Sequence, residues 1–184
     1  HIVSAWTSEN NMVLGQVKTN EKSNEITAIP ELLELLDVQG SVVTIDAMGT
    51  QKQIADMIVQ KKADYVLSVK GNQQTMYDDI RTYFDEGLKT DFKDMAYESC
   101  RTIEKGHGRI EKREYFLCNE IDWVEWSKDW KRLGGIGMVR RSVTKDGQTS
   151  QEISYFITSL PRNAEMFGKA VRGHWGVESM HWSL

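Results

Sequence analysis

Two strand-to-helix alternations follow one another between residues 41 and 86, and they restrict the fold more than any other feature. Residues 41–46 are rich in β-branched side chains, and a helical pattern capped by Thr50 follows them. Residues 64–69 repeat the strand pattern and lead into a helix over residues 73–86. Such crossovers are right-handed and join parallel strands, so the sequence predicts a parallel pair with helices beside it.

The flanking segments predict further strands and helices. A hairpin is expected from residues 1–7 and 12–19, and a helix capped by Ser23 or Asn24 is expected to run to Gly40. From about residue 94 the pattern changes to strands bounded by glycine-containing turns, over residues 97–105, 110–118, 136–145 and 151–158. After Pro161 helical spacing returns.

Together these patterns predict an α/β protein with a mixed sheet flanked by helices and an antiparallel β insertion before the last helix. We divide the chain into a first α/β part over residues 1–93, a β-rich insertion over residues 94–160 and a C-terminal helix over residues 161–184.

Charge is distributed unevenly along the 184 residues, which carry a formal net charge of −4. Residues 1–96 hold 15 acidic and 9 basic side chains, whereas residues 97–184 hold 12 acidic and 14 basic ones. Basic stretches at residues 101–113 and 128–145 could neutralise phosphates, and the alternative is an ordinary solvated strand face.

Other features exclude several classes of protein. No apolar run is long enough to span a membrane, and no P-loop or dinucleotide-binding glycine motif supports a nucleotide cofactor. The two cysteines, Cys100 and Cys118, do not suggest a disulfide scaffold and fit a reducing cytoplasm. With His107 they lack zinc-ligand spacing, so free thiols are expected.

Asp46 is the first candidate for chemistry because it ends the strand of residues 41–46. Alternation places Val42, Thr44 and Asp46 on one face, and open α/β sheets bind ligands at the carboxyl ends of parallel strands. From the spacing alone, Asp46 is either a metal ligand or an acid that caps the following turn.

Glu178 is the second candidate. It shares one face of the final helix with His174 and His181, at spacings of four and three residues. A carboxylate on the apolar side of a helix needs a partner or a metal. Three interpretations stay open: a local metal site of these three residues, a structural face with satisfied polar groups, or one ligand of a two-metal site shared with a distant Asp.

Five motifs, in this order along the chain, resemble bacterial insertion-sequence transposases of the DDE type, specifically the H-repeat-associated proteins. They lie at residues 21–26, 44–51, 69–73, 107–111 and 172–182. The resemblance implies a ribonuclease-H-like core, in which two Asp and one Glu hold two divalent cations, Mg²⁺ or Mn²⁺, for DNA strand cleavage and strand transfer. Asp46 matches the second acid and Glu178 the third.

The same resemblance implies DNA contacts within the motifs, at Lys70, Asn72, Gln73, Arg109, Arg172 and His174. In related families the final helix carries Tyr and Arg where this sequence has Val171 and His174, so the role of His174 stays open. Turn chemistry for Asn72 and surface solvation for the others are the alternatives. The implied partners are transposon ends and target DNA, and a homodimer stays open.

The family's first catalytic Asp belongs to a strand that precedes the segment seen here, so we expect this chain to be a fragment without transposase or nuclease activity of its own. That strand would lie between the hairpin and the strand of Asp46. Its absence predicts a gap in the sheet, a shifted register or a strand borrowed from another copy. Two other functions remain open, a ribonuclease-H-like nuclease or resolvase and a non-catalytic DNA-binding remnant.

Overall fold

The computed structural model describes residues 2–7, 12–18, 25–106 and 108–181. Its first part contains, in chain order, β1 (Ile2–Thr7), β2 (Met12–Lys18), α1 (Glu25–Leu35), β3 (Val42–Ile45), the short 3₁₀ helix η1 (Ala47–Gly49), α2 (Lys52–Gln60), β4 (Asp64–Val69), η2 (Gly71–Gln73) and α3 (Gln74–Lys89). Its second part contains β5 (Glu98–Gly106), β6 (Arg109–Cys118), η3 (Glu125–Asp129), β7 (Gly135–Lys145), β8 (Gln148–Thr158) and α4 (Ala164–His181).

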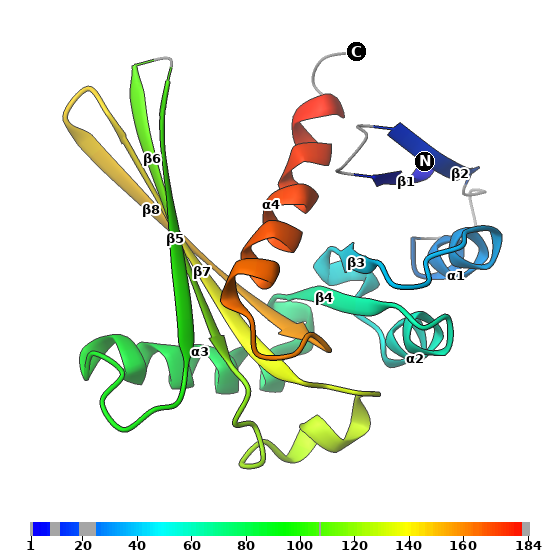
Figure 1. The fold of residues 1–184 in the computed structure, drawn as a ribbon, viewed down its shortest axis with the longest axis horizontal. Coiled ribbons are helices and arrows are strands. Elements are labelled where there is room, and N and C mark those ends of the chain that lie inside the picture. The colour runs from blue at the N-terminus through cyan, green and yellow to red at the C-terminus, as the bar shows by residue number, and fades with distance from the viewer. Residues whose placement is uncertain (1, 8–11, 19–24, 107, 182–184) are drawn as a thin grey trace.

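Six strands form the central sheet, in the order β3-β4-β8-β7-β6-β5 (Figure 1). β3 and β4 run parallel, and every other neighbouring pair is antiparallel. The predicted mixed sheet, its parallel pair and its four antiparallel strands are therefore confirmed. Because β8 pairs with β4, strands from both sides of residue 93 belong to one sheet. The division of the chain at residues 93 and 160 stays a prediction.

The two faces of the sheet are covered by different helices. On one face α1, α2 and α3 share a core with alternate residues of the strands, where Phe84 of α3 is buried with Phe116, Met138 and Tyr155. On the other face Phe167 and Val171 of α4 pack among Tyr115, Leu117, Val139 and Phe156. Strand alternation thus sends successive side chains to different helices.

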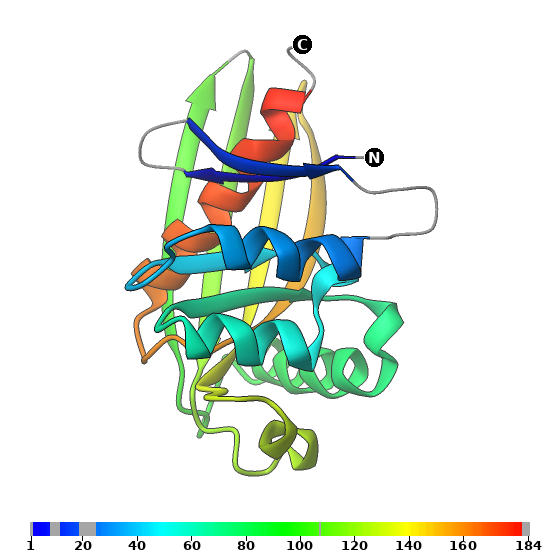
Figure 2. The ribbon, with the colours of Figure 1, turned by 90° about the vertical axis from the view of Figure 1, so that its right-hand side faces the viewer.

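The hairpin β1-β2 forms a two-stranded sheet of its own. It packs against α1, and within the described ranges no strand pairing joins it to β3. β3 is consequently an edge strand. This arrangement, in which the hairpin passes above α1 and β3 (Figure 2), is compatible with a gap, one of the three expected outcomes, and does not test the strand that the resemblance places there.

Two predicted boundaries differ from the structure, because α1 ends at Leu35 and not near Gly40, and because Thr50 does not cap α2. Gln51, not Thr50, occupies the N-cap position, and its side chain makes no capping hydrogen bond. Thr50 is wholly buried, and its hydroxyl donates to the Ser68 carbonyl of β4 at 2.6 Å. The expected caps of α1, Ser23 and Asn24, lie outside the described residues.

Two smaller predictions concern the cysteines and membrane spans. Cys118 is buried and Cys100 partly buried, and both are free thiols as expected. Among the described helices, none has the length and apolar character needed to cross a membrane.

Candidate catalytic site

Asp46 lies directly after β3, at the carboxyl edge of the parallel pair. Its backbone stays extended (φ −72°, ψ 167°), so its side chain keeps the alternation of the strand and shares a face with Thr44. Oδ1 accepts a 3.3 Å hydrogen bond from the Met48 amide and so caps η1. The capping interpretation is correct, but it uses only one oxygen of an exposed carboxylate. Asp46 can cap the turn and still present an oxygen to a ligand.

The turn after Asp46 is fastened by neutral side chains from the end of β4. Asn72 Nδ2 donates to the Ala47 carbonyl at 2.8 Å, and Gln73 Nε2 donates to the Thr50 carbonyl at 2.9 Å. Gly49 closes the turn against the core, because a Cβ there would collide with Ile45 and Ile29. These contacts hold the backbone that carries Asp46 in one position.

Asn72 and Gln73 were expected to contact DNA, and their amide nitrogens instead donate to protein carbonyls. A DNA contact through their other atoms stays a prediction. The positioning role of the two amides was missed by the sequence analysis. The one sequence feature that pointed to this role was that residues 69–73 lie at the end of a strand predicted to be parallel to the strand of Asp46.

Glu178 belongs to the last turn of α4, and its side chain lies outside the described residues, as does that of His181. One turn earlier, the partly buried His174 ring places Nδ1 3.2 Å from Thr44 Oγ1. This contact joins α4 to β3 at a residue that shares a face with Asp46. Glu178 follows His174 by four residues, a rise of about 6 Å along the helix, and Asp46 follows Thr44 by about 7 Å along the strand.

The two acids are thus carried by backbone segments that meet at one contact. No group of three or more His, Cys, Asp or Glu side chains gathers within the part of the chain that the structure describes. Asp46 provides carboxylate oxygen, the ligand type that Mg²⁺ and Mn²⁺ prefer. Among the described residues, the oxygen ligand that a divalent cation prefers is thus offered at this edge by Asp46, and a metal site there stays a prediction.

Of the three Lys and Arg residues predicted to contact DNA, one lies at the edge that carries Asp46 and two lie elsewhere. Lys70 is exposed at the same edge as Asp46, and no ion pair to it occurs among the described residues. Arg172 of α4 is directed to β5 instead. Its Nη2 atom lies 2.7 Å from both carboxylate oxygens of Glu104. Arg109 does not lie at the site. It is opposite Lys145 in the strand register, at the far end of the β6-β7 ladder.

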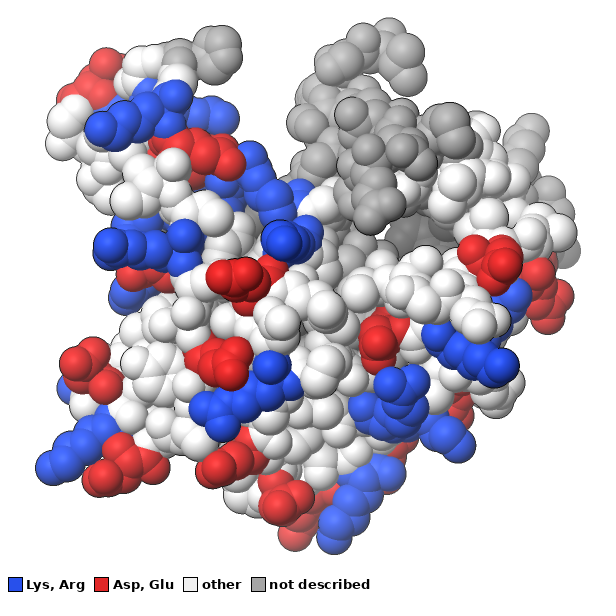
Figure 3. Space-filling view, viewed as in Figure 1, with Lys and Arg blue, Asp and Glu red and all other residues white. Residues whose placement is uncertain are grey.

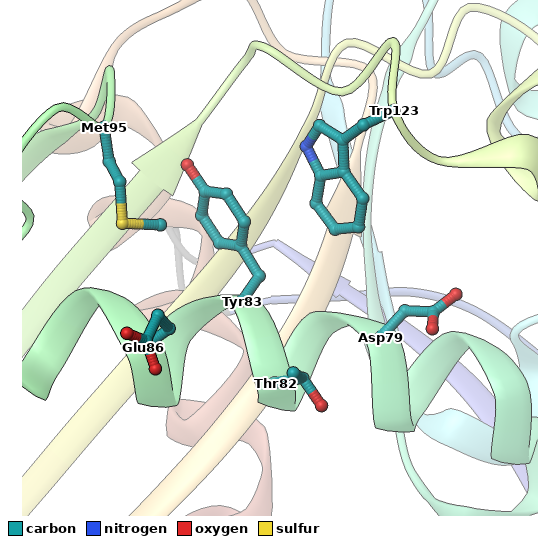
Figure 4. Close-up of a pocket in the computed structure, with 6 residues that line it drawn as sticks. All are labelled: Asp79, Thr82, Tyr83, Glu86, Met95 and Trp123. Carbon is teal, nitrogen blue, oxygen red and sulfur yellow. The ribbon is translucent and has the colours of Figure 1, made fainter.

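A shallow pocket of about 290 Å³ lies along α3 (Figure 4). It is lined by Asp79, Thr82, Tyr83, Glu86, Met95 and Trp123, and the Tyr83 and Trp123 rings stack at 5.2 Å. None of the predicted site residues lines it. The candidate site is the one around Asp46, at the carboxyl edge of β3 and β4.

Comparison with known proteins identifies the family to which the chain belongs. The family model described as "Transposase DDE domain" matches residues 1–184. This chain belongs to the DDE transposase family. Its six-stranded mixed sheet with helices on both faces is the ribonuclease-H-like architecture that the resemblance implied.

Relatives with transposase names include "Putative transposase YncI" of Escherichia coli O157:H7, which is 43% identical over the whole chain and 48% of its own length. "H repeat-associated putative transposase YhhI" of Escherichia coli K12 is 39% identical over the whole chain and 50% of its own length. The chain spans about half the length of these curated relatives. No solved structure matches it.

Proposed function

We propose that this DDE transposase chain supplies two of the acids, and much of the sheet, of a catalytic core that cleaves and joins DNA strands in transposition. The contact between His174 and Thr44 is the observation that supports this most directly. This contact holds α4 against β3. Asp46 follows Thr44 by two residues of the strand, and Glu178 follows His174 by about one turn of the helix.

Asp46 and Glu178 would hold Mg²⁺ or Mn²⁺ through their carboxylate oxygens. Bound cations would supply activation of the attacking water or DNA 3′-hydroxyl and stabilisation of the leaving oxygen. The chain's own residues set the geometry. Thr50, Asn72 and Gln73 hold the Asp46 turn, and the exposed Lys70 at the same edge can neutralise a phosphate.

The site can be tested through metal binding without requiring catalysis. Mn²⁺ titrations followed by electron paramagnetic resonance should show binding that Asp46→Asn and Glu178→Gln each weaken by about tenfold or more, because each removes an anionic ligand. Glu31→Gln, which neutralises an exposed acid of α1, is the matched control and should leave the titration unchanged. Equal binding in all four proteins would refute a site at these acids.

Activity gives a second test. The family requires three acids and this sequence matches two, so we propose that the 184-residue chain alone does not cut DNA. Supercoiled plasmid incubated with the chain and Mn²⁺ should stay uncut. Metal-dependent nicking that disappears in Asp46→Ala would show that two acids suffice.

The remaining features of the proposal follow from DNA as the substrate. Transposon ends and target DNA are the proposed partners, a homodimer is the proposed assembly, and the cytoplasm is the proposed location. Preference for element ends over unrelated duplex in a competition binding assay would favour a transposase over a general nuclease or resolvase. Equal affinity for both would favour those alternatives.

A further inference from the structure

The distal parts of β5, β6, β7 and β8 form an arm, defined here as residues 101–106, 108–114 and 140–153. It extends beyond the helices as two hairpins (Figure 1). β4 pairs with β8 only over Tyr155–Thr158, so the arm is a four-stranded ribbon that continues past the end of β4. Lys and Arg gather on it in Figure 3, where it projects at the upper left.

Strand register assigns each side chain of the arm to one of two faces. The face that continues from Phe116 and Met138, over α3, is called the α3-side face, and the face that continues from Tyr115 and Val139, over α4, is called the α4-side face. Contacts confirm both assignments. Arg140 lies 5.9 Å over the Phe116 ring on the α3-side face, and Arg172 of α4 reaches Glu104 on the α4-side face.

Charges on the α4-side face are largely paired within the protein. Its cations are Arg109, Arg113, Arg141 and Lys145, and its carboxylates are Glu104, Glu111 and Glu152. Glu111 is only 5% exposed at its side chain, and it forms ion pairs with Arg109, Arg113 and Arg141. Glu104 pairs with Arg113 and with Arg172. This face carries an ion-pair network that extends along the arm as far as Arg109 at its tip.

Charges on the α3-side face are not balanced in this way. Arg101, Lys105, Lys112 and Arg140 share a single carboxylate, Glu114, which pairs with Lys112 at 2.8 Å and Arg140 at 2.9 Å. Arg101 and Lys105 are exposed and have no ion pair with any described residue. They lie on the edge strand β5, four residues apart, which is about 13 Å. The face carries three uncompensated positive charges over a length equal to the rise of about four base pairs.

The rest of the α3-side face is also suited to a phosphate backbone. Ser142, Thr144, Thr149 and Gln151 occupy the neighbouring positions of β7 and β8. Their hydroxyl and amide groups form hydrogen bonds only with one another among the described residues, Thr144 with Thr149 at 2.8 Å and Gln151 with Ser142 at 3.3 Å. Such groups commonly donate to phosphate oxygens. Ile103 and Ile110 are about half exposed between the cations, so no helix covers this face.

We infer that the α3-side face of the arm binds the phosphate backbone of a DNA duplex, as a second DNA contact on the face opposite to α4. The inference rests on the proposed function in taking DNA as the partner, and it adds a surface separate from Asp46 and Glu178. It also assigns the DNA contact of the arm to Arg101 and Lys105, on the face that does not carry Arg109.

The test is the salt dependence of duplex binding, measured by fluorescence anisotropy with a labelled duplex of arbitrary sequence. Arg101→Gln/Lys105→Gln should weaken binding about tenfold at low salt and lower the slope of log affinity against log salt by about two, because two phosphate contacts are lost. Its thermal unfolding midpoint should not change, since both side chains are exposed and unpaired.

Two matched pairs separate this surface from a general charge effect. Arg109→Gln/Lys145→Gln removes two cations from the α4-side face of the same arm, and Arg81→Gln/Lys89→Gln removes two from α3. Both should change affinity less than about threefold. Equal losses in all three pairs, or no loss in the first, would overturn the inference.

Failure of the catalytic proposal gives a different pattern. Arg101→Gln/Lys105→Gln should bind Mn²⁺ as tightly as the wild type, and a chain that binds no Mn²⁺ at Asp46 should still show the salt dependence that these two side chains supply. Loss of Mn²⁺ binding and loss of arm-dependent DNA binding are thus independent outcomes.

Discussion

The edge that carries Asp46 and the α4-side face of the arm are stabilised by different interactions. Neutral hydrogen bonds hold the Asp46 turn, from the buried hydroxyl of Thr50 and the amides of Asn72 and Gln73. The α4-side face of the arm depends on charge, because the Glu111 carboxylate is enclosed by arginines. Neutral contacts leave the Asp46 carboxylate as the principal charge at its turn, whereas the arm uses its own carboxylates on one face and leaves cations available on the other.

The largest stability effect should come from breaking the charged network. Glu111→Gln leaves Arg113, 6% exposed at its side chain, and Arg141 without their shared carboxylate, and removal of one member of a buried ion pair costs about 3–5 kcal/mol. Urea unfolding should show this loss. Glu152→Gln is the control, because Glu152 also pairs with Arg141 but is 66% exposed, and it should cost less than about 1 kcal/mol. Similar losses in the two variants would mean that burial does not decide the strength of the network.

The pH dependence of stability gives a second test with the same Glu111→Gln variant. Burial acts to raise the pKa of Glu111, but the hydrogen bond from Arg141 and the charges of Arg113, Arg141 and Arg109 outweigh it and lower the pKa below 4.5. A lowered folded-state pKa gives stability that is present above the ordinary carboxyl pKa and is lost as pH falls through the folded-state value. Wild-type stability should therefore decline below about pH 4.5, and Glu111→Gln should decline less steeply.

A smaller effect is expected at the neutral edge. Thr50→Val keeps the shape of the side chain but leaves the Ser68 carbonyl without its 2.6 Å donor, at a cost of about 1–3 kcal/mol. Because no charge is involved, the loss in urea unfolding should be the same at pH 5 and pH 8 and at low and high salt. A loss that changed strongly with salt would contradict the neutral character of this edge.

The sequence predicted the strands, the parallel pair and the position of Asp46, because those depend on local patterns of period two and on short crossovers. It did not predict that Thr50 would be buried and bonded to β4, since a threonine before a helix is more often a cap. Nor could basic composition show which face of the arm has surplus charge. That depends on the β5-β6 and β6-β7 registers, which place Arg101 beside Glu114 and Arg113 beside Arg141.

The smallest effect should occur at the ion pair between Lys52 of α2 and Asp129 of η3. Its N–O distance of 2.6 Å is shorter than most in the structure, yet both side chains are more than half exposed. Water screens such a pair and ordering two long side chains offsets the attraction, so Lys52→Gln should change the free energy of unfolding by less than about 0.5 kcal/mol. Urea unfolding of Lys52→Gln, Asp129→Asn and the double variant would measure the coupling. A coupling as large as that of Glu111 with its arginines would show that distance, more than burial, sets the strength of ion pairs in this protein. The contrast between the α4-side face of the arm and the rest of the surface would then disappear.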